Sequence, residues 1–232
     1  MKITFNISFY IFVYILILSG YINYLVSYLI IMFFHELGHI ITIKLLKYKV
    51  TSIYILPGGG IINTNINLNI KSFHLFLISI SGILFQIPLL LINNNILDQM
   101  NISLIIFNLL PIIPNDGYKI LLSINENIFK YRICHIISII ISFIMLYIVF
   151  YLTKNILIFT TLFIINIKNI MNYKYIINKF LLERYLYKTN YKRIKYINNI
   201  KDIYKCRNNY IKCDKIVHEE EMLLRKIFMS SY

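Results

Sequence analysis

Apolar residues dominate most of the chain in long runs that short polar stretches separate. About 20 consecutive apolar residues are enough for a helix to span a bilayer. By that measure the pattern predicts six spans, at roughly residues 3–19, 23–46, 73–93, 100–114, 131–152 and 155–171. The fourth span is short and stops at Pro111 and Pro114, which predicts a broken helix. A break at membrane depth is tolerated only where it is buried in protein or lines a cavity.

The segment 48–72, between the second and third spans, has a different pattern. Pro57 is followed by three glycines, and isoleucine and asparagine then alternate as far as Ile70. Alternation favours short strands, and glycine permits positive φ and close backbone approach. We therefore expect a short glycine-rich loop that can form a β-hairpin. No Lys-Ser or Lys-Thr pair follows the glycines, which argues against a phosphate-binding loop.

These patterns predict an all-α membrane protein with about six transmembrane helices and two parts. Residues 1–171 would form a polytopic membrane domain, and residues 172–232 a basic cytosolic tail. The composition agrees, because 58% of the 232 residues are hydrophobic. The three cysteines form no C-x-x-C pair, so neither a disulfide framework nor a cysteine zinc site is expected.

The formal charge of +14 is concentrated near the C-terminus, where residues 172–232 carry fourteen Lys/Arg against six acidic residues. Basic loops mark the cytosolic side of a membrane protein. With six spans, this rule places both termini in the cytosol. The bilayer is then the expected partner of the basic tail, through anionic lipid, and we expect no nucleic-acid partner.

Carboxylates are rare in the apolar part of the chain, where residues 1–171 contain only Glu36, Asp98, Asp116 and Glu126. An Asp at the centre of a membrane helix costs about 2.5–3.5 kcal/mol on insertion scales, so an ionisable residue at that depth indicates a function. Glu36 and Asp116 both lie in apolar stretches, and the predicted topology puts both near the cytosolic side.

His35 and His39 are four residues apart and therefore share one helix face. Two imidazoles at this spacing can bind one zinc ion, and a catalytic zinc site needs three protein ligands and one open position. Asp116 is the expected third ligand, and Glu36 is the expected general base acting on water. This donor set predicts one Zn²⁺ per chain and metal-assisted hydrolysis of a peptide bond.

Two further residues are secondary candidates. Asn108 lies eight residues before Asp116 on the same element, and its amide could stabilise negative charge on a substrate carbonyl. Interhelical hydrogen bonding is the simpler interpretation of Asn108. Gly59 lies in the glycine-rich loop, which could pair with an extended substrate strand by edge addition.

The chain resembles the site-2 protease family of intramembrane zinc metalloproteases. The resemblance rests on His-Glu-Leu-Gly-His at 35–39 and on Asn-Leu-Leu-Pro-x-x-Pro-x-Asp-Gly at 108–117. The Leu-Pro-Gly-Gly-Gly loop at 56–60 adds a likeness to the sporulation branch of that family. The resemblance implies zinc held by His35, His39 and Asp116, with Glu36 as the catalytic carboxylate.

The resemblance also implies a membrane-tethered substrate, the precursor of a sporulation sigma factor, an inhibitory membrane partner, and a location in the outer forespore membrane. Asn115 and Tyr118 depart from the family pattern without removing a ligand. The alternatives are a different substrate, a metal transporter or sensor that does not hydrolyse peptides, and an inactive scaffold. No internally repeated halves, as transporters often have, are evident in the sequence.

Overall fold

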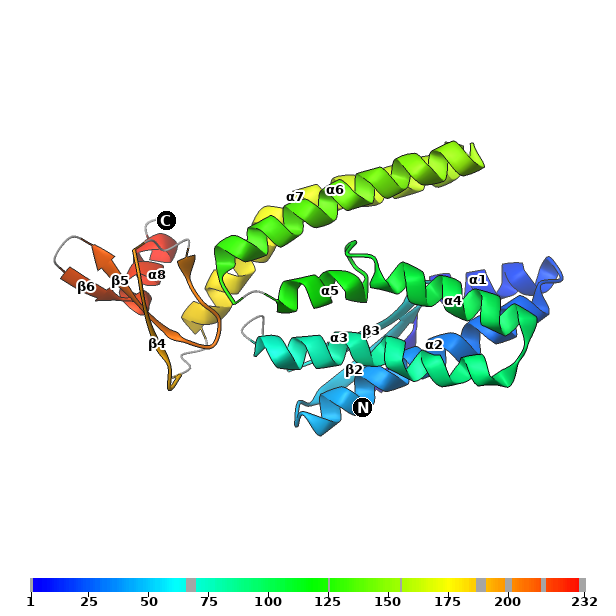
Figure 1. Cartoon of the computed structure of the whole chain (residues 1–232), viewed down its shortest axis with the longest axis horizontal. Coiled ribbons are helices and arrows are strands. Elements are labelled where there is room, and N and C mark those ends of the chain that lie inside the picture. The colour runs from blue at the N-terminus through cyan, green and yellow to red at the C-terminus, as the bar shows by residue number, and fades with distance from the viewer. Residues whose placement is uncertain are drawn as a thin grey trace. The chain divides into compact units, whose positions relative to one another are not determined.

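The computed structural model describes residues 2–65, 70–124, 126–154, 156–186, 191–198, 202–213 and 216–229. The chain divides into two compact units (Figure 1). The first comprises Met1–Ile66, Phe73–Leu110 and Asn115–Ile120, and the second comprises Asn67–Ser72, Pro111–Pro114 and Leu121–Tyr232.

The first unit is built from helices around a small sheet. Its elements, some of which extend by a few residues beyond the unit, are β1 (Lys2–Phe5), α1 (Ile7–Leu18), α2 (Ile22–Leu45), β2 (Val50–Leu56), β3 (Gly59–Thr64), α3 (Ser72–Gln86), the 3₁₀ helix η1 (Ile87–Ile92), α4 (Asn95–Leu109) and α5 (Asp116–Ser123). Asparagines begin two of the helices, because the Asn6 side chain accepts a hydrogen bond from the Ser8 amide and Asn94 accepts from Ile96 and Leu97.

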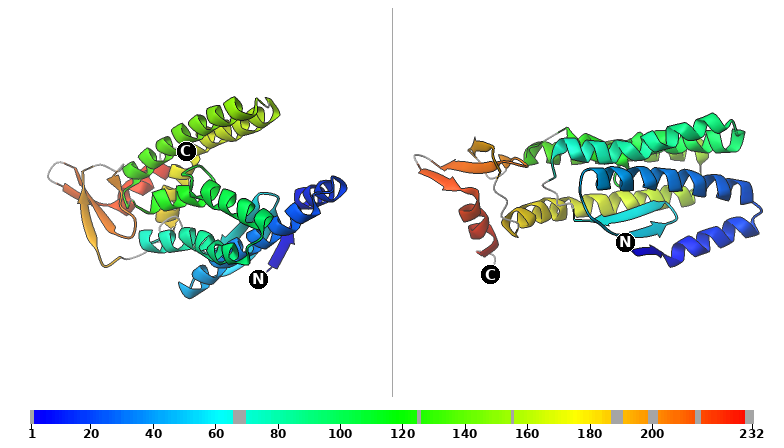
Figure 2. Two further views of the ribbon diagram at one scale, coloured as in Figure 1. Left: turned by 45° about the vertical axis from the view of Figure 1, so that its right-hand side comes forward. Right: turned by 90° about the horizontal axis from the view of Figure 1, so that it is seen from below.

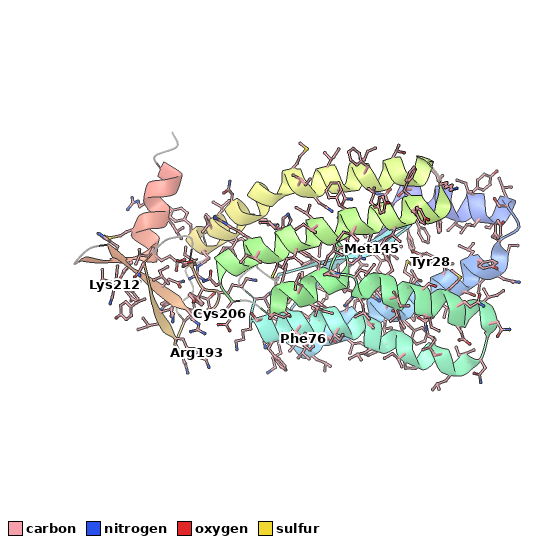
Figure 3. All side chains as sticks on the ribbon, turned by 45° about the horizontal axis from the view of Figure 1, so that its top comes forward. Tyr28, Phe76, Met145, Arg193, Cys206 and Lys212 are labelled. Atoms are coloured by element: carbon pink, nitrogen blue, oxygen red, sulfur yellow. The ribbon has the colours of Figure 1, made fainter. Side chains whose placement is uncertain are left out.

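The sheet has the order β1-β2-β3, with β1 parallel to β2 and β2 antiparallel to β3. The β2–β3 turn lies in the glycine-rich segment, where Leu56 pairs with Gly59. Both strands lie beside α2 (Figure 2). Tyr28 of α2, labelled in Figure 3, donates a hydrogen bond from its hydroxyl to the Pro57 carbonyl and so fixes this turn to the helix.

Helix α2 also packs on its other neighbours through apolar contacts. Ile31 of α2 is fully buried and forms a cluster with Leu89 of η1 and Leu97 of α4. Beside the cluster, the Asn101 amide donates a hydrogen bond of 2.9 Å to the Gln86 carbonyl, which satisfies a backbone oxygen where α3 gives way to η1. The turn of α2 that precedes His35 is therefore held by apolar packing.

The second unit contains two long helices and a tail. Helices α6 (Ile128–Thr153) and α7 (Ile156–Leu186) lie side by side, and the tail comprises β4 (Ile194–Ile197), β5 (Asn208–Cys213), β6 (Ile216–Glu219) and α8 (Glu220–Met229). In the tail sheet, β4 is parallel to β5 and β5 is antiparallel to β6.

The tail has a hydrophobic core of its own. Phe180 of α7 packs with Ile211 of β5, Leu224 of α8 and two further isoleucines, Ile197 and Ile203. The Arg184 guanidinium forms an ion pair with Glu220 and also donates to the carbonyls of Tyr204 and Arg207. Because α7 runs through residue 171, the last predicted span and the start of the tail belong to one continuous helix.

The structure is mainly helical, which confirms that part of the fold predicted from the sequence. The predicted all-α class, with at most a hairpin at 48–72, left out part of the β structure, because each unit contains a three-stranded sheet. The described part of the chain has two helices that are long and apolar enough to cross a membrane, Ile22–Leu45 and Ser72–Ile92, and shorter apolar helices at Ile7–Leu18 and Arg132–Ile148. The predicted count of six spans is not confirmed. At 1.5 Å per residue, the 12 residues of α1 fall short of a hydrocarbon core about 30 Å thick.

Candidate metal centre

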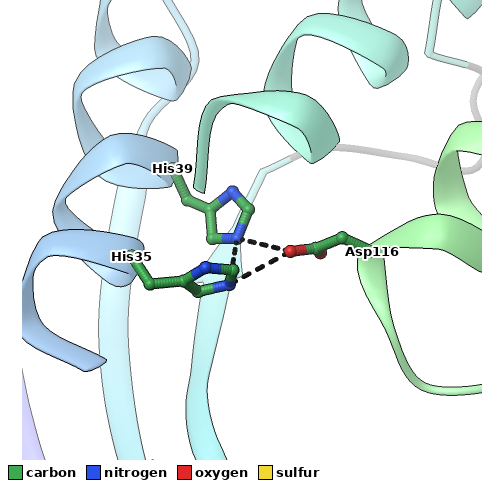
Figure 4. A group of neighbouring side chains, drawn as sticks. All are labelled: His35, His39 and Asp116. Carbon is green, nitrogen blue, oxygen red and sulfur yellow. Dashed lines mark hydrogen bonds and ion pairs between the residues drawn. The ribbon is translucent and has the colours of Figure 1, made fainter. Parts of the chain in front are cut away.

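Three potential metal ligands converge within the first unit. His35 and His39 lie one turn apart on α2, and Asp116 is the first residue of α5. The Nε2 atoms of the histidines are 3.1 Å apart, and each lies 3.1 Å from Asp116 Oδ2 (Figure 4). All three residues have little exposure to solvent, so the cluster is a potential metal site inside the fold.

Contacts behind the cluster orient two of the three donors. His39 Nδ1 lies 2.7 Å from the Ile78 carbonyl oxygen, which can only accept, so Nδ1 carries the proton. In a neutral ring Nε2 is then a lone-pair donor that faces the cluster. Lys119 Nζ donates to Asp116 Oδ1 at 2.8 Å, so the second carboxylate oxygen, Oδ2, is left for the histidines. Such outer contacts commonly fix the ligands of metal sites.

The arrangement places like groups against each other. His39 Nε2 and Asp116 Oδ2 are both electron-pair donors, yet only 3.1 Å separates them. A cation between them removes this repulsion. Tetrahedral zinc, with bonds of about 2.0–2.1 Å, places its ligand atoms about 3.3–3.4 Å apart, close to the 3.1 Å observed. Two imidazoles and one carboxylate also match the donor set of a catalytic zinc site.

Glu36 lies between the histidines in sequence and is held separately from them. Its Oε1 accepts a hydrogen bond of 2.6 Å from the Gly60 amide at the start of β3. Its Oε2 is buried and has no hydrogen-bond partner among the described residues. Burying an unpaired carboxylate oxygen is costly, so this atom is poised to accept a proton or a hydrogen bond from a bound molecule.

Glycines permit the close approach of the surrounding elements. A Cβ on Gly82 of α3 would lie 2.6 Å from His39 Nε2 and 2.7 Å from His35 Cε1. A Cβ on Gly60 would lie 2.7 Å from Glu36 Cδ, and one on Gly38 would lie 2.5 Å from the Ser81 carbonyl oxygen. Any side chain at these positions would displace the site or its support.

The break between α4 and α5 positions Asp116. Leu110 ends α4 in an extended conformation, and α5 begins at Asp116. The Asn115 amide donates a hydrogen bond of 2.7 Å to the Phe107 carbonyl, and a Cβ on Gly117 would collide with the carbonyl of Leu109. The first turn of α5 is therefore packed against the end of α4.

The sequence-based candidates are placed as follows. His35, His39 and Asp116 come together in one cluster, whereas Glu36, next to His35 on α2, has its carboxylate on the Gly60 amide. Gly59 has a φ of 134°, and a Cβ added to it would lie 3.6 Å from Glu36 Oε1, but the hydrogen bond to Glu36 comes from Gly60.

Asn108 is half-buried on the last turn of α4, and its side chain makes no hydrogen bond within the described residues. Lys119, Gly60 and the close approach of Gly82 were not predicted from the sequence. Lys119 could have been found, because a charge three residues after Asp116 lies on the same helix face.

No family model matches the chain, but comparisons with single proteins find similar ones. Stage IV sporulation protein FB of Bacillus subtilis is 30% identical over 118 positions, an alignment that covers 45% of this chain and 41% of the relative. The matched region is thus less than half of the length of that protein. The site-2 protease from Methanocaldococcus jannaschii has a similar structure, with a TM-score of 0.51 and 26% identity over 74% of this chain and 91% of the other.

The chain is thus similar in sequence and fold to a site-2 protease, and in part of its sequence to a sporulation protein. Both likenesses confirm the resemblance seen in the sequence motifs.

Proposed function

We propose that the protein is an intramembrane zinc endopeptidase that cleaves a membrane-tethered protein near the cytosolic face of the membrane. The observation that carries this proposal is the convergence of the three donors, together with the buried, unpartnered Oε2 of Glu36, which follows His35 on the same helix. Its free Oε2 is a buried carboxylate atom that a purely structural metal site does not require. The relationship to the site-2 proteases supports the same reaction.

Each residue has a distinct part in this reaction. His35, His39 and Asp116 hold the metal, which when bound supplies the Lewis acidity that polarises a peptide carbonyl and acidifies water. Glu36 Oε2 removes a proton from the attacking water and later delivers it to the leaving nitrogen. The Gly60 amide, bonded to Oε1, fixes the carboxylate so that Oε2 is the atom that exchanges the proton. Asn108 is proposed as a donor to the developing oxyanion, and Gly59 as part of a loop that pairs with the extended substrate.

A membrane location is supported by the surface of the helices as well as by the relatives. Ile7, Leu18, Leu91 and Tyr147 are each more than two-thirds exposed, on α1, η1 and α6. Exposed apolar side chains of this size are stable against lipid and costly against water. We propose a multi-pass membrane protein whose membrane domain ends near residue 171. The tail that follows, like the N-terminus, lies in the cytosol.

The finer proposal concerns the substrate. Similarity to a stage IV sporulation protein supports a role in sporulation, and the motif resemblance suggests the outer forespore membrane as its location. The motif resemblance adds a sigma-factor precursor as the substrate and an inhibitory membrane protein as the regulator. The competing function is a metal transporter or sensor that uses the same ligands without hydrolysis.

One experiment separates these functions. The full chain, as wild type and as Glu36→Gln, is co-expressed with a membrane-tethered sigma-factor precursor. The wild type and the variant are then each purified for zinc analysis. We expect processing with the wild type, loss of processing with the variant, and one zinc ion per chain in both. Processing that survives Glu36→Gln contradicts the protease. Metal transport that survives it, with no processing by the wild type, favours the transporter.

A further inference from the structure

The turn between β2 and β3 is held on α2 by hydrogen bonds at two points. Tyr28 of α2 donates from its hydroxyl to the Pro57 carbonyl, and the Gly60 amide donates to Glu36 Oε1 at 2.6 Å. Tyr28 and Glu36 are eight residues apart on α2, which is about 12 Å along the helix axis. All four residues belong to the first unit. One helix thus holds both ends of one turn, and the second hydrogen bond reaches the proposed general base.

The turn needs these hydrogen bonds because its own sequence gives it little rigidity. Pro57 has no N–H group, and the three residues that follow are glycines, which have the largest backbone freedom. The pairing of β2 with β3 ends at Leu56 and Gly59. A Cβ added to Gly58 would meet no atom within 4 Å, so the tip of the turn is not packed. The contacts with α2 therefore decide where the turn lies.

The ring and the hydroxyl of Tyr28 have separate partners. The ring packs edge-on against Phe12 of α1, with centroids 5.7 Å apart, whereas the hydroxyl binds the turn. A phenylalanine would keep the ring contact, so packing alone gives no reason for a tyrosine at position 28. Tyr24, one turn earlier, fits the simpler role of a tyrosine near the end of a membrane helix. It is 48% exposed, and its hydroxyl makes no hydrogen bond within the described residues.

We propose that Tyr28 is a positioning residue for Glu36 and acts on it through the β2–β3 turn. Its hydroxyl fixes the Pro57 carbonyl and so keeps the Gly60 amide within reach of Oε1. That amide restricts rotation of the carboxylate, while Oε2 stays buried and available for the proton. Without the hydroxyl, the turn moves away from α2 more often and the carboxylate rotates. The inference rests on the proposed function, in that it takes Glu36 as the general base.

The test compares the full-length wild type with Tyr28→Phe and with the matched control Tyr24→Phe. Each substitution removes one hydroxyl from α2 and leaves the ring in place. Hydrogen–deuterium exchange measures the amides of residues 58–60, chelator competition measures zinc affinity, and the membrane-tethered sigma-factor precursor serves as substrate for kcat and KM. We expect Tyr28→Phe to speed exchange at Gly60 about fivefold, the factor that one lost hydrogen bond corresponds to, and to lower kcat by up to the same factor. KM and zinc affinity should stay at the wild-type values, and Tyr24→Phe should match the wild type throughout.

Unchanged exchange at Gly60 in Tyr28→Phe overturns the inference, as does faster exchange with a wild-type kcat. An equal loss in both variants would reflect the helix in general and also rejects it, and weaker zinc binding would place the effect on the metal ligands instead. Failure of Tyr28→Phe to fold, with Tyr24→Phe intact, assigns the hydroxyl to folding and rejects the positioning role. A wild type that cleaves no precursor defeats the proposed function, and with it the role of Tyr28, whereas wild-type cleavage with an unchanged Tyr28→Phe defeats only this inference.

Discussion

Replacing Gly82 by alanine tests whether the two histidines form the metal site at which the structure places them. The new Cβ would lie 2.6 Å from His39 Nε2, whereas ordinary contacts begin at about 3.4 Å. Helix α3 and the histidines must therefore separate by about 0.8 Å, the difference between these two distances. The lengths of metal–ligand bonds vary by only about 0.2 Å in a well-formed site. The displacement exceeds this tolerance about fourfold, so the site must lose a ligand or change its geometry.

We expect Gly82→Ala to weaken zinc binding at least tenfold, since contacts behind the ligands alone are worth about 10–100-fold. The affinity is measured on purified protein by chelator competition, and the cleavage rate is measured at saturating zinc. Gly58→Ala is the matched control, because nothing lies within 4 Å of its added Cβ and its φ is not positive. Wild-type zinc affinity in Gly82→Ala, with Gly58→Ala also unchanged, would refute the assignment of the histidine pair.

Two other substitutions affect the site from different sides. Lys119→Met removes the hydrogen bond to Asp116 Oδ1 and frees the carboxylate to rotate. We therefore expect zinc affinity to fall about tenfold in the same competition assay. An unchanged affinity would show that the lysine does not orient the ligand. Gly60→Ala places a Cβ 2.7 Å from Glu36 Cδ. We expect this variant to lose cleavage while its zinc affinity stays at the wild-type value. Parallel loss of cleavage and zinc binding would mean that Glu36 is itself a ligand.

The metal-site residues were accessible from the sequence because each is chemically unusual in its setting. His35, His39 and Asp116 are ionisable groups in apolar stretches, and the helical spacing of the histidines places them on one face. Asp116 follows a proline-rich break, which indicated that it turns away from the helix before it. The structure brings these atoms to 3.1 Å of one another, although 77 residues separate His39 and Asp116 in the chain.

The supporting contacts could not be predicted in the same way, because they depend on which elements become neighbours. The Ile78 carbonyl that fixes His39 belongs to the backbone and has no sequence signature. Gly82 is one glycine in an apolar helix until α3 is placed against α2. The tail strands were missed since their short segments, such as 194–197, lack a clear period of two, and the sheet forms through non-local pairing.

The polar residues around Asp116 acquire a common explanation from the electrostatics of the metal-free site. Without a cation, Asp116 Oδ2 faces the electron pair of His39 in surroundings that screen charge poorly. This repulsion would push the carboxylate away, and the metal would then have to organise its own third ligand on binding. Lys119 and Asn115 each hold the carboxylate or the backbone beside it, through hydrogen bonds that do not involve the metal. In an otherwise apolar chain, their role is to place the ligand in advance, so that less of the binding free energy is spent on ordering the site.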